Sequence, residues 1–251
     1  GLLYIVGDFT DAGGAATADK ICTWNGSAFA SITTGGAANN TIFTIAISRV
    51  GQIYVGGAFT DIGASGADYI ARYSPGDGSW NVVVGATTMT SYVYDIIPDP
   101  WGDGVIVAGA FTNVGGDGTK DYLLRITVSG TTYAYSLIGS AAPNAAVRAL
   151  HYDELTGRLY ALGEFTSIGG VTVAKVAYYD GTNWNAMGTG VTGTITTQAG
   201  IASENGKIHI AAPITAADGI TPPDGFVTWS GNRWYGQKLD ATGGTYSARG
   251  V

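Results

Sequence analysis

A short pattern of an apolar strand, Gly-x-Phe-Thr and a Gly-rich turn occurs four times along this chain, and once more in degraded form. The copies read LYIVGDFTDAGG at 3–14, IYVGGAFTDIGA at 53–64, VIVAGAFTNVGG at 105–116, LYALGEFTSIGG at 159–170 and IHIAAPITAADG at 208–219. The threonines of successive copies lie 50, 52, 54 and 49 residues apart, at Thr10, Thr60, Thr112, Thr166 and Thr215. A repeat of this length corresponds to one four-stranded blade of a β-propeller.

The fourth copy shows best how one repeat is built. Apolar alternation predicts strands over 146–153, 158–166, 174–180 and 184–188, which we call A, B, C and D. Gly-rich or Asn-rich turns separate them, because both residue types tolerate the positive φ angles of tight turns. Each repeat is therefore predicted to be a meander of four antiparallel strands.

The fold class that follows is all-β, a five-bladed β-propeller in one domain spanning 1–251. The repeats cover approximately 2–40, 41–90, 91–140, 141–190 and 191–240. The chain starts with a B strand, and its last residues, 244–251, match strand A of the other repeats. We expect this C-terminal strand to complete the N-terminal blade and close the ring, which would leave no open sheet edge.

The run G-x-F-T-x-x-G-G, followed by a strand and by Trp after a turn, resembles the kelch-like propeller repeat of bacterial, phage and fungal surface proteins. The second part is best kept in VAYYDGTNW at 176–184 and IARYSPGDGSW at 70–80, and the fifth copy departs most, with Ala212-Pro213-Ile214 in place of Gly-x-Phe. The resemblance implies a propeller fold and a surface location. It implies no particular activity, because propellers host many unrelated functions.

Composition narrows the partners of the chain. Its 19 acidic and 12 basic residues give a net charge of −7, and no basic run is present, which is a poor match to nucleic acid. No apolar run is long enough for a membrane-spanning helix, so no membrane insertion is expected. Cys22 is the only cysteine, so it cannot form an internal disulfide, and its place in a predicted strand indicates a small buried residue.

Strand order predicts that the B–C loops and the D–A connections lie at one end of each blade. These segments are long, polar and poor in charge, whereas the A–B and C–D turns at the other end are short. Long loops carry spare hydroxyl and amide groups for a partner. Residues expected to bind a ligand there are Asn39, Asn40, Asp68, Asp117, Asp121 and Asp218. The Thr hydroxyls of the repeat are expected to bond backbone groups of the following loop.

The sequence predicts no enzyme, no catalytic residue, no metal site and no cofactor. A five-bladed glycoside hydrolase is the alternative, and it needs two carboxylates facing each other. Only Asp95 lies inside a predicted A strand, while Asp99, Asp153 and Glu204 fall at A–B turns, where acids commonly bond turn backbone. No Ser-His-Asp, metal-ligand or phosphate-loop spacing is present.

The function expected from the sequence is that of an extracellular, cell-surface or virion recognition and scaffold module. It would bind a cell-surface glycan or protein through its long-loop face, as part of a longer or oligomeric surface assembly. The alternative within the same class is a purely structural spacer propeller inside a longer surface or phage tail protein.

Overall fold

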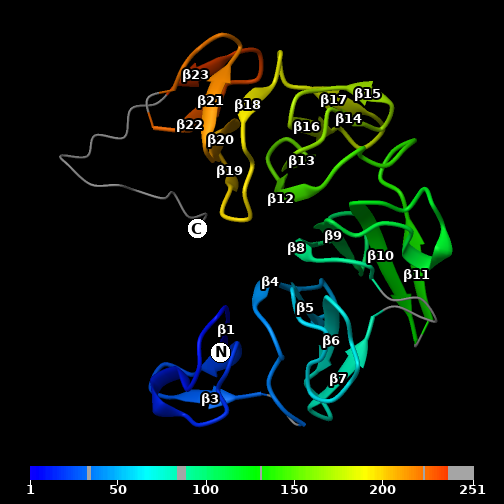
Figure 1. The fold of residues 1–251 in the computed structure, drawn as a ribbon, viewed down its shortest axis with the longest axis vertical. Coiled ribbons are helices and arrows are strands. Elements are labelled where there is room, and N and C mark those ends of the chain that lie inside the picture. Colours follow the sequence, from blue (N-terminus) through cyan, green and yellow to red (C-terminus); the bar gives the residue numbers. More distant parts are fainter. Residues whose placement is uncertain (33–34, 84–88, 131, 223, 237–251) are drawn as a thin grey trace. The chain divides into compact units, whose positions relative to one another are not determined.

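A computed structural model of the chain describes residues 1–32, 35–83, 89–130, 132–222 and 224–236. The chain divides into two compact units, Gly1–Ser136 and Leu137–Val251, and we describe each by itself. The strands of both units are labelled in Figure 1.

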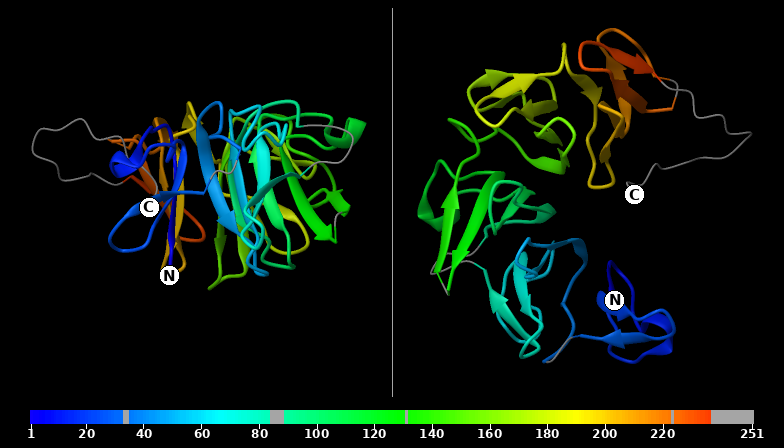
Figure 2. Two further views of the ribbon diagram at one scale, coloured as in Figure 1. Left: turned by 90° about the horizontal axis from the view of Figure 1, so that it is seen from below. Right: turned by 180° about the vertical axis from the view of Figure 1, so that it is seen from behind.

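The first unit holds three antiparallel sheets, which Figures 1 and 2 show in several orientations. The sheet of the first repeat has the order β1-β2-β3, that of the second repeat β4-β5-β6-β7, and that of the third repeat β8-β9-β10-β11. Short 3-10 turns, η1 at Ala12–Gly14 and η2 at Val114–Gly116, lie in two of the B–C loops. The strands are β1 Leu3–Val6, β2 Ile21–Trp24, β3 Phe29–Ser31, β4 Ile42–Ile47, β5 Ile53–Gly57, β6 Ile70–Ser74, β7 Ser79–Val82, β8 Val93–Pro98, β9 Val105–Gly109, β10 Leu123–Ser129 and β11 Thr132–Ser136.

The second unit holds two four-stranded sheets, with the orders β12-β13-β16-β17 and β19-β20-β22-β23. Two-stranded ribbons in its loops pair β14 with β15 and β18 with β21. The strands are β12 Val147–Asp153, β13 Arg158–Gly163, β14 Ser167–Ile168, β15 Val171–Thr172, β16 Val176–Tyr179, β17 Trp184–Ala186, β18 Val191–Gly193, β19 Gly200–Glu204, β20 Lys207–Ala211, β21 Ile214–Ala217, β22 Phe226–Trp229 and β23 Trp234–Gly236.

The predicted meander is confirmed in these sheets. Strands A, B, C and D pair antiparallel in chain order in the second to fifth repeats. In the first repeat the described residues give only strands B, C and D, and the predicted closing strand 244–251 lies outside the described residues. The chain is therefore all-β and propeller-like, with antiparallel sheets of four strands.

In the second, third and fourth repeats, strand B is buried on consecutive residues rather than on alternate ones, whereas β1 of the first repeat is partly exposed and β20 of the fifth alternates. Every residue of β5 and β9 is buried, as are Leu159–Gly163 of β13. A strand covered on both faces needs a continuous apolar sequence, which explains why the repeat pattern is apolar before its glycine. Within each unit, the apolar residues of neighbouring repeats share a core: Ile21 of the first repeat packs with Ile42 and Val55 of the second, and Tyr160 of the fourth with Ile208 of the fifth.

The glycine of Gly-x-Phe-Thr is required by close backbone approach. A Cβ atom at Gly57 would lie 2.3 Å from the carbonyl oxygen of Thr41, where strand A begins. The next amide, that of Ala58, donates a hydrogen bond to this same oxygen at 2.9 Å. The glycine therefore lets strands A and B meet, and the buried phenylalanine two residues on, Phe59, holds the turn against the core.

The aromatic residue at strand D joins successive repeats in the second unit. The indole Nε1 of Trp184 donates to the carbonyl oxygen of Ile138 at 2.6 Å, and that of Trp234 donates to Met187 at 2.9 Å. Both indoles are almost fully buried. Each of these rings thus ties its own sheet to the end of the preceding repeat.

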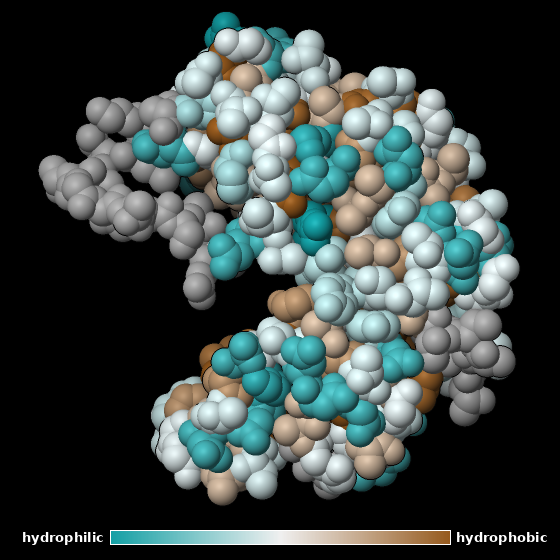
Figure 3. Space-filling view, in the orientation of Figure 1, coloured by the Kyte–Doolittle hydropathy of each residue, from teal (hydrophilic) through white to brown (hydrophobic). Residues whose placement is uncertain are grey.

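Two findings concern the surface and the thiol. Over the part of the chain that the structure describes, no helix has the length and apolarity to cross a membrane. Figure 3 shows hydrophobic and hydrophilic residues interspersed over the face drawn there. Cys22 is buried in β2, as expected, and burial raises the pKa of its thiol.

Candidate functional site

The long-loop end of the sheets, made of the B–C loops and the D–A connections, is held together by side-chain hydrogen bonds. The amide of Asn39 donates to the hydroxyl of Thr60 at 2.9 Å, and its carbonyl accepts from the backbone N–H of Thr60 at 2.9 Å. Asn144 makes the same pair of bonds with Thr166, at 2.8 Å and 2.9 Å. The threonine hydroxyls were expected to bond the loop that follows them. In these two repeats their partner is instead an asparagine of the preceding D–A connection.

Backbone hydrogen bonds add to this connection between the two loop sets. The N–H of Gly63 donates to Gly36 at 3.0 Å, and the N–H of Asn39 donates to Asp61 at 3.0 Å. The fourth repeat repeats the arrangement, with Gly169 donating to Ala141 at 3.0 Å. In the second and fourth repeats, the B–C loop and the D–A connection therefore form one layer rather than two separate flaps.

Five of the predicted binding residues belong to the first unit. Asn39 clamps Thr60, and the exposed Asn40 accepts from the N–H of Thr41 at 2.8 Å. Asp121 accepts from the N–H of Asn113 at 2.7 Å, across the B–C loop of the third repeat. The partly buried Asp68 precedes strand β6. These contacts shape the loops, and ligand binding by these residues stays a prediction.

Asp117 is the fifth of these residues, and its carboxylate is strongly stabilised. The hydroxyl and N–H of Thr119 donate to its Oδ1 at 2.7 Å and 3.0 Å, and Lys120 lies 3.2 Å from its Oδ2. The hydrogen bonds from Thr119, followed by that from Lys120, lower the pKa of Asp117 to about 2. Asp117 therefore carries a full negative charge in any ordinary buffer.

Asp218 is the one predicted binding residue in the second unit. Its carboxylate accepts from the N–H of Thr189 at 2.6 Å and from the hydroxyl of the same residue at 2.5 Å. Its backbone has a φ of 45°, which is uncommon outside glycine and fixes the direction of the loop. Asp218 thus links the B–C loop of the fifth repeat to the D–A connection before it.

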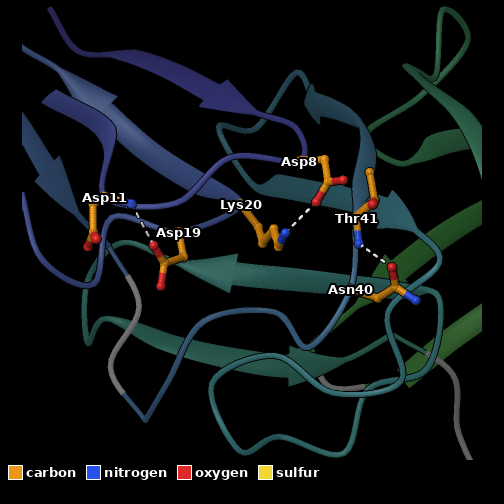
Figure 4. Close-up of polar contacts among 6 residues, drawn as sticks. All are labelled: Asp8, Asp11, Asp19, Lys20, Asn40 and Thr41. Carbon is orange, nitrogen blue, oxygen red and sulfur yellow. Dashed lines mark hydrogen bonds and ion pairs between the residues drawn. The ribbon is translucent and has the colours of Figure 1, made fainter. Parts of the chain in front are cut away.

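Two acid–lysine pairs stand at equivalent places in the first and fourth repeats. Lys20 bonds Asp8, and Figure 4 shows this pair beside Thr41 and Asn40 at the start of the second repeat. The hydrogen bond and the charge of Lys20 lower the pKa of Asp8. In the fourth repeat, Lys175 bonds Glu164. The other oxygen of Glu164 accepts from the N–H of Ile195 at 2.5 Å.

A histidine, a serine and an aspartate meet in the second unit, which the sequence analysis did not foresee. The Nε2 atom of His151 lies 2.8 Å from the Oγ of Ser203, and that hydroxyl donates to Asp153 at 3.1 Å. Burial lowers the pKa of His151, and the neighbouring Asp153 carboxylate partly opposes this shift. The repeat period could have indicated this contact from the sequence, because residues about one repeat apart in strands β12 and β19 become neighbours.

The same period brings together Asp95 of β8 and Thr44 of β4, whose hydroxyl donates to the carboxylate at 3.2 Å. Two of the three A–B turn acids have the expected turn contacts: Asp99 accepts from the N–H of Trp101 at 2.9 Å, and Asp153 from that of Leu155 at 3.2 Å. The third, Glu204, ends strand β19 and lies 3.9 Å from Nε2 of His209. Asp99 is fully buried and pairs with Arg125 at 2.5 Å. Among the described residues, no group of three or more His, Cys, Asp or Glu side chains could hold a metal ion.

Comparison with known proteins supports an all-β, propeller-like fold. The model of a β-propeller domain family of unknown function, DUF5122, matches residues 51–82, which span the B, C and D strands of the second repeat. No curated protein matches the chain. The kelch-like identity of the repeat stays a prediction.

Two solved structures are similar at low identity. One is described as the "putative gluconolactonase in protein family", with 12% identity and a TM-score of 0.45 over 77% of this chain. The other is the Cps50 (Swd1) β-propeller domain of Myceliophteria thermophila, with 10% identity and a TM-score of 0.37 over 84% of this chain. This chain spans 64% of the length of the first structure and 68% of the second.

One expectation is corrected by these comparisons. The sequence predicted that the protein is not an enzyme, and this is wrong as a general exclusion, because a structure similar in fold to this chain is described as a "putative gluconolactonase". The similarity at 12% identity concerns the fold and gives no residue of this chain a catalytic role.

Proposed function

We propose that this chain is a recognition module of an extracellular, cell or virion surface that binds a neutral glycan through the long-loop end of its sheets. The observation that carries the proposal is the hydrogen-bonded layer formed there by the B–C loops and the D–A connections. Loops that are already fixed lose little conformational entropy when a ligand binds, so they favour recognition.

Charge supports a neutral ligand. Three of the acids predicted in this layer are engaged by neighbouring groups: Asp117 by Thr119 and Lys120, Asp121 by Asn113, and Asp218 by Thr189. A ligand would therefore meet hydroxyl groups, amides and backbone rather than spare charges. Binding through such groups depends little on ionic strength, in contrast to ion pairing. Weak single sites would gain strength from several copies displayed in one longer or oligomeric assembly.

The proposed architecture behind this surface is a propeller of five blades in one domain. Its support is the sheet of the first repeat, in which β1 has β2 as its neighbour and the described residues supply no strand A. The segment 244–251, which has the sequence of a strand A, would pair with β1 and close the ring. Deleting 244–251 should then lower the thermal midpoint markedly, and an unchanged midpoint would contradict closure.

A glycan array with two matched variants tests the function. Asn40→Ala changes an exposed asparagine at the long-loop end, whose carbonyl accepts from the N–H of Thr41. Asn25→Ala changes an exposed asparagine in the C–D turn of the first repeat, whose carbonyl accepts from the N–H of Ser27 at 2.9 Å. We expect Asn40→Ala and Asp117→Ala to weaken glycan binding, and Asn25→Ala to leave it intact. Absence of any wild-type binding would favour the structural spacer instead.

A further inference from the structure

Four aromatic side chains of the first unit gather at the long-loop end of the second and third repeats. The ring centroids of Phe43 and Tyr94 are 6.0 Å apart with an interplanar angle of 28°, so these two rings are stacked. Tyr92 lies 6.2 Å from Phe43 and 6.3 Å from Tyr94, edge-on to both, and Tyr69 lies 5.8 Å from Tyr92. We call Phe43, Tyr69, Tyr92 and Tyr94 the aromatic platform.

Bulges in the A strands β4 and β8 determine where two of these rings lie. In β4 the pairing with β5 skips Phe43, between Ile42 and Thr44. In β8 the pairing with β9 skips Tyr94, between Val93 and Asp95. A bulge leaves one residue outside the ladder and turns its side chain away from the regular alternation. The equivalent bulge of β12 carries Arg148 instead, so among the described bulges those of the second and third repeats place an aromatic ring at this point.

The platform is partly exposed to solvent. Phe43 is 38% exposed and Tyr92 is 42% exposed, although most large apolar side chains of the chain are buried. Rings of this size contribute more to stability when they are covered, so the exposure of two adjacent rings leaves apolar area that a partner could cover. Aromatic side chains are also enriched among residues that dominate binding energy.

The spacing of the rings selects the shape of a partner. Centroids about 6 Å apart place neighbouring rings in van der Waals contact, so no ligand group fits between them. The rings therefore do not form a cage that encloses a cation. Tyr92 stands at 76° to Phe43, so a flat ligand can lie on the face of one of these rings and against the edge of the other. The C–H groups on one side of a pyranose ring form such a flat apolar face, and they pack well on the electron-rich faces of aromatic rings.

Polar groups beside the rings, and a tyrosine in place of the lysine of other repeats, support the same ligand class. Beside the rings, the hydroxyl of Thr44 donates to Asp95 at 3.2 Å and accepts from the N–H of Ile96 at 3.2 Å. At the position where the first and fourth repeats carry Lys20 and Lys175, the second carries Tyr69. An apolar surface beside a few fixed polar groups is typical of small-ligand sites and favours an uncharged ligand rich in hydroxyl groups.

We propose that the aromatic platform is the subsite on which a sugar ring of a neutral oligosaccharide stacks. This inference rests on the proposed function and deepens it, because it names the contact residues and the ligand class. The apolar face of a pyranose lies on the face of one of the two exposed rings, Phe43 or Tyr92, and against the edge of the other, which stands at 76° to it. Its equatorial hydroxyl groups reach Thr44, Asp95 and the tyrosine hydroxyl groups.

The test measures binding of cello-, malto-, manno- and N-acetylchito-hexaose by ligand-observed NMR. The variant Phe43→Leu/Tyr92→Leu removes the ring faces but keeps apolar bulk, so the fold should be little affected. The matched control is Trp101→Leu, since Trp101 is 39% exposed in the A–B turn between β8 and β9, at the opposite end of the same sheet. Thermal unfolding of each variant checks the fold.

We expect at least one hexaose to bind the wild type, with binding about tenfold weaker in the double variant. Trp101→Leu, which retains the platform rings and their hydroxyl groups, should bind like the wild type. Loss of the same size in Trp101→Leu would overturn the inference. If Asn40→Ala and Asp117→Ala weaken binding and the double variant does not, this inference fails while the proposed function stands.

If no hexaose binds the wild type, the inference and the glycan function both fail. Ring-dependent retention of a deglycosylated protein, with no oligosaccharide bound, would make the platform a protein-docking surface and would also overturn the proposal.

Discussion

Four of the five repeats share one backbone arrangement at the start of strand C but divide into two pairs by their side chains. The residue there has a φ of 61° to 65° in each case, in the left-handed region that is uncommon outside glycine. Its N–H donates to the carbonyl of the repeat phenylalanine, and its own carbonyl accepts from the repeat glycine. These residues are Lys20, Tyr69, Tyr122 and Lys175.

The side chains at this point change together with the residue between Gly and Phe. The first and fourth repeats pair Lys20 with Asp8 and Lys175 with Glu164. The second and third repeats place Tyr69 and Tyr122 opposite Ala58 and Ala110. A fixed backbone frame thus carries either an ion pair or a tyrosine beside an alanine.

Three of these side-chain pairs reach the start of the following repeat. Asp8 is stabilised by the hydroxyl of Thr41, Glu164 accepts from the N–H of Ile195, and Tyr69 contacts the ring of Tyr92. The repeat glycine and phenylalanine thus fix the backbone at the start of strand C in all four repeats. The side-chain pair, either lysine with an acid or tyrosine with alanine, determines the chemistry of the contact between repeats. That chemistry is electrostatic after the first and fourth repeats and aromatic after the second.

The largest effect is expected for Glu164→Ala. This change removes the partner of Lys175 and leaves the N–H of Ile195, a residue that is 1% exposed, without its acceptor. We expect a loss of about 2 kcal/mol in the free energy of unfolding, measured by chemical denaturation. Glu164→Gln keeps an acceptor for Ile195 and should lose less. Equal losses in both variants would show that the ion pair alone matters.

A smaller change in the free energy of unfolding is expected when the acid–lysine pair of the fourth repeat is exchanged for the alanine–tyrosine pair of the second. The double variant Glu164→Ala/Lys175→Tyr gives the fourth repeat the pair found in the second. Lys175→Tyr alone leaves Glu164 without its cation, so we expect the double variant to be more stable, by about 1 kcal/mol, than the sum of the single losses predicts. Additive losses in denaturant titrations would mean that the pair does not act as a unit.

The strand framework was predictable from the sequence because it depends on local patterns. Apolar runs before Gly-x-Phe-Thr gave the B strands, and turn residues gave the C–D hairpins, such as the turn at Asn25-Gly26-Ser27. The acids Asp99 and Asp153 at the A–B turns were also anticipated. Each of these features depends on residues close together in the chain.

The contacts between repeats could not be predicted in the same way. Asn39 and Asn144 clamp threonines 21 and 22 residues later, and no local rule indicates such a partner. The proximity of His151 to Ser203, and of Phe43 to Tyr94, depends on how the A strands of successive repeats are aligned. Bulges in these strands shift that alignment. Reading the sequence at a one-repeat offset would have suggested these pairs.

Strand A also differs between repeats at a position that affects how stability depends on pH. His151 occupies a position that is Ala46 in the second repeat and Ile97 in the third. Burial lowers its pKa below 6.5, so the unfolded chain binds a proton at higher pH than the native chain does. Stability from the neutral imidazole is therefore complete above pH 6.5 and is lost progressively below it. Thermal midpoints of His151→Gln should vary less with pH in that range than those of the wild type, and identical profiles would contradict the assignment.

The smallest effect is expected for Asp8→Asn, and it separates the two charged repeats. The carboxylate of Asp8 is 66% exposed, whereas that of Glu164 is 30% exposed and also accepts from a buried N–H. Salt screens exposed charges much more than partly buried ones. The loss of thermal stability caused by Asp8→Asn should thus be small in dilute buffer and vanish at high salt, while the loss caused by Glu164→Ala should persist. If both losses vanish, the hydrogen bond that the N–H of Ile195 donates to Glu164 contributes nothing to stability, and the two charged repeats are equivalent. If both persist, the contact between Asp8 and Thr41 stabilises the junction of the first and second repeats as strongly as the buried bond does in the fourth.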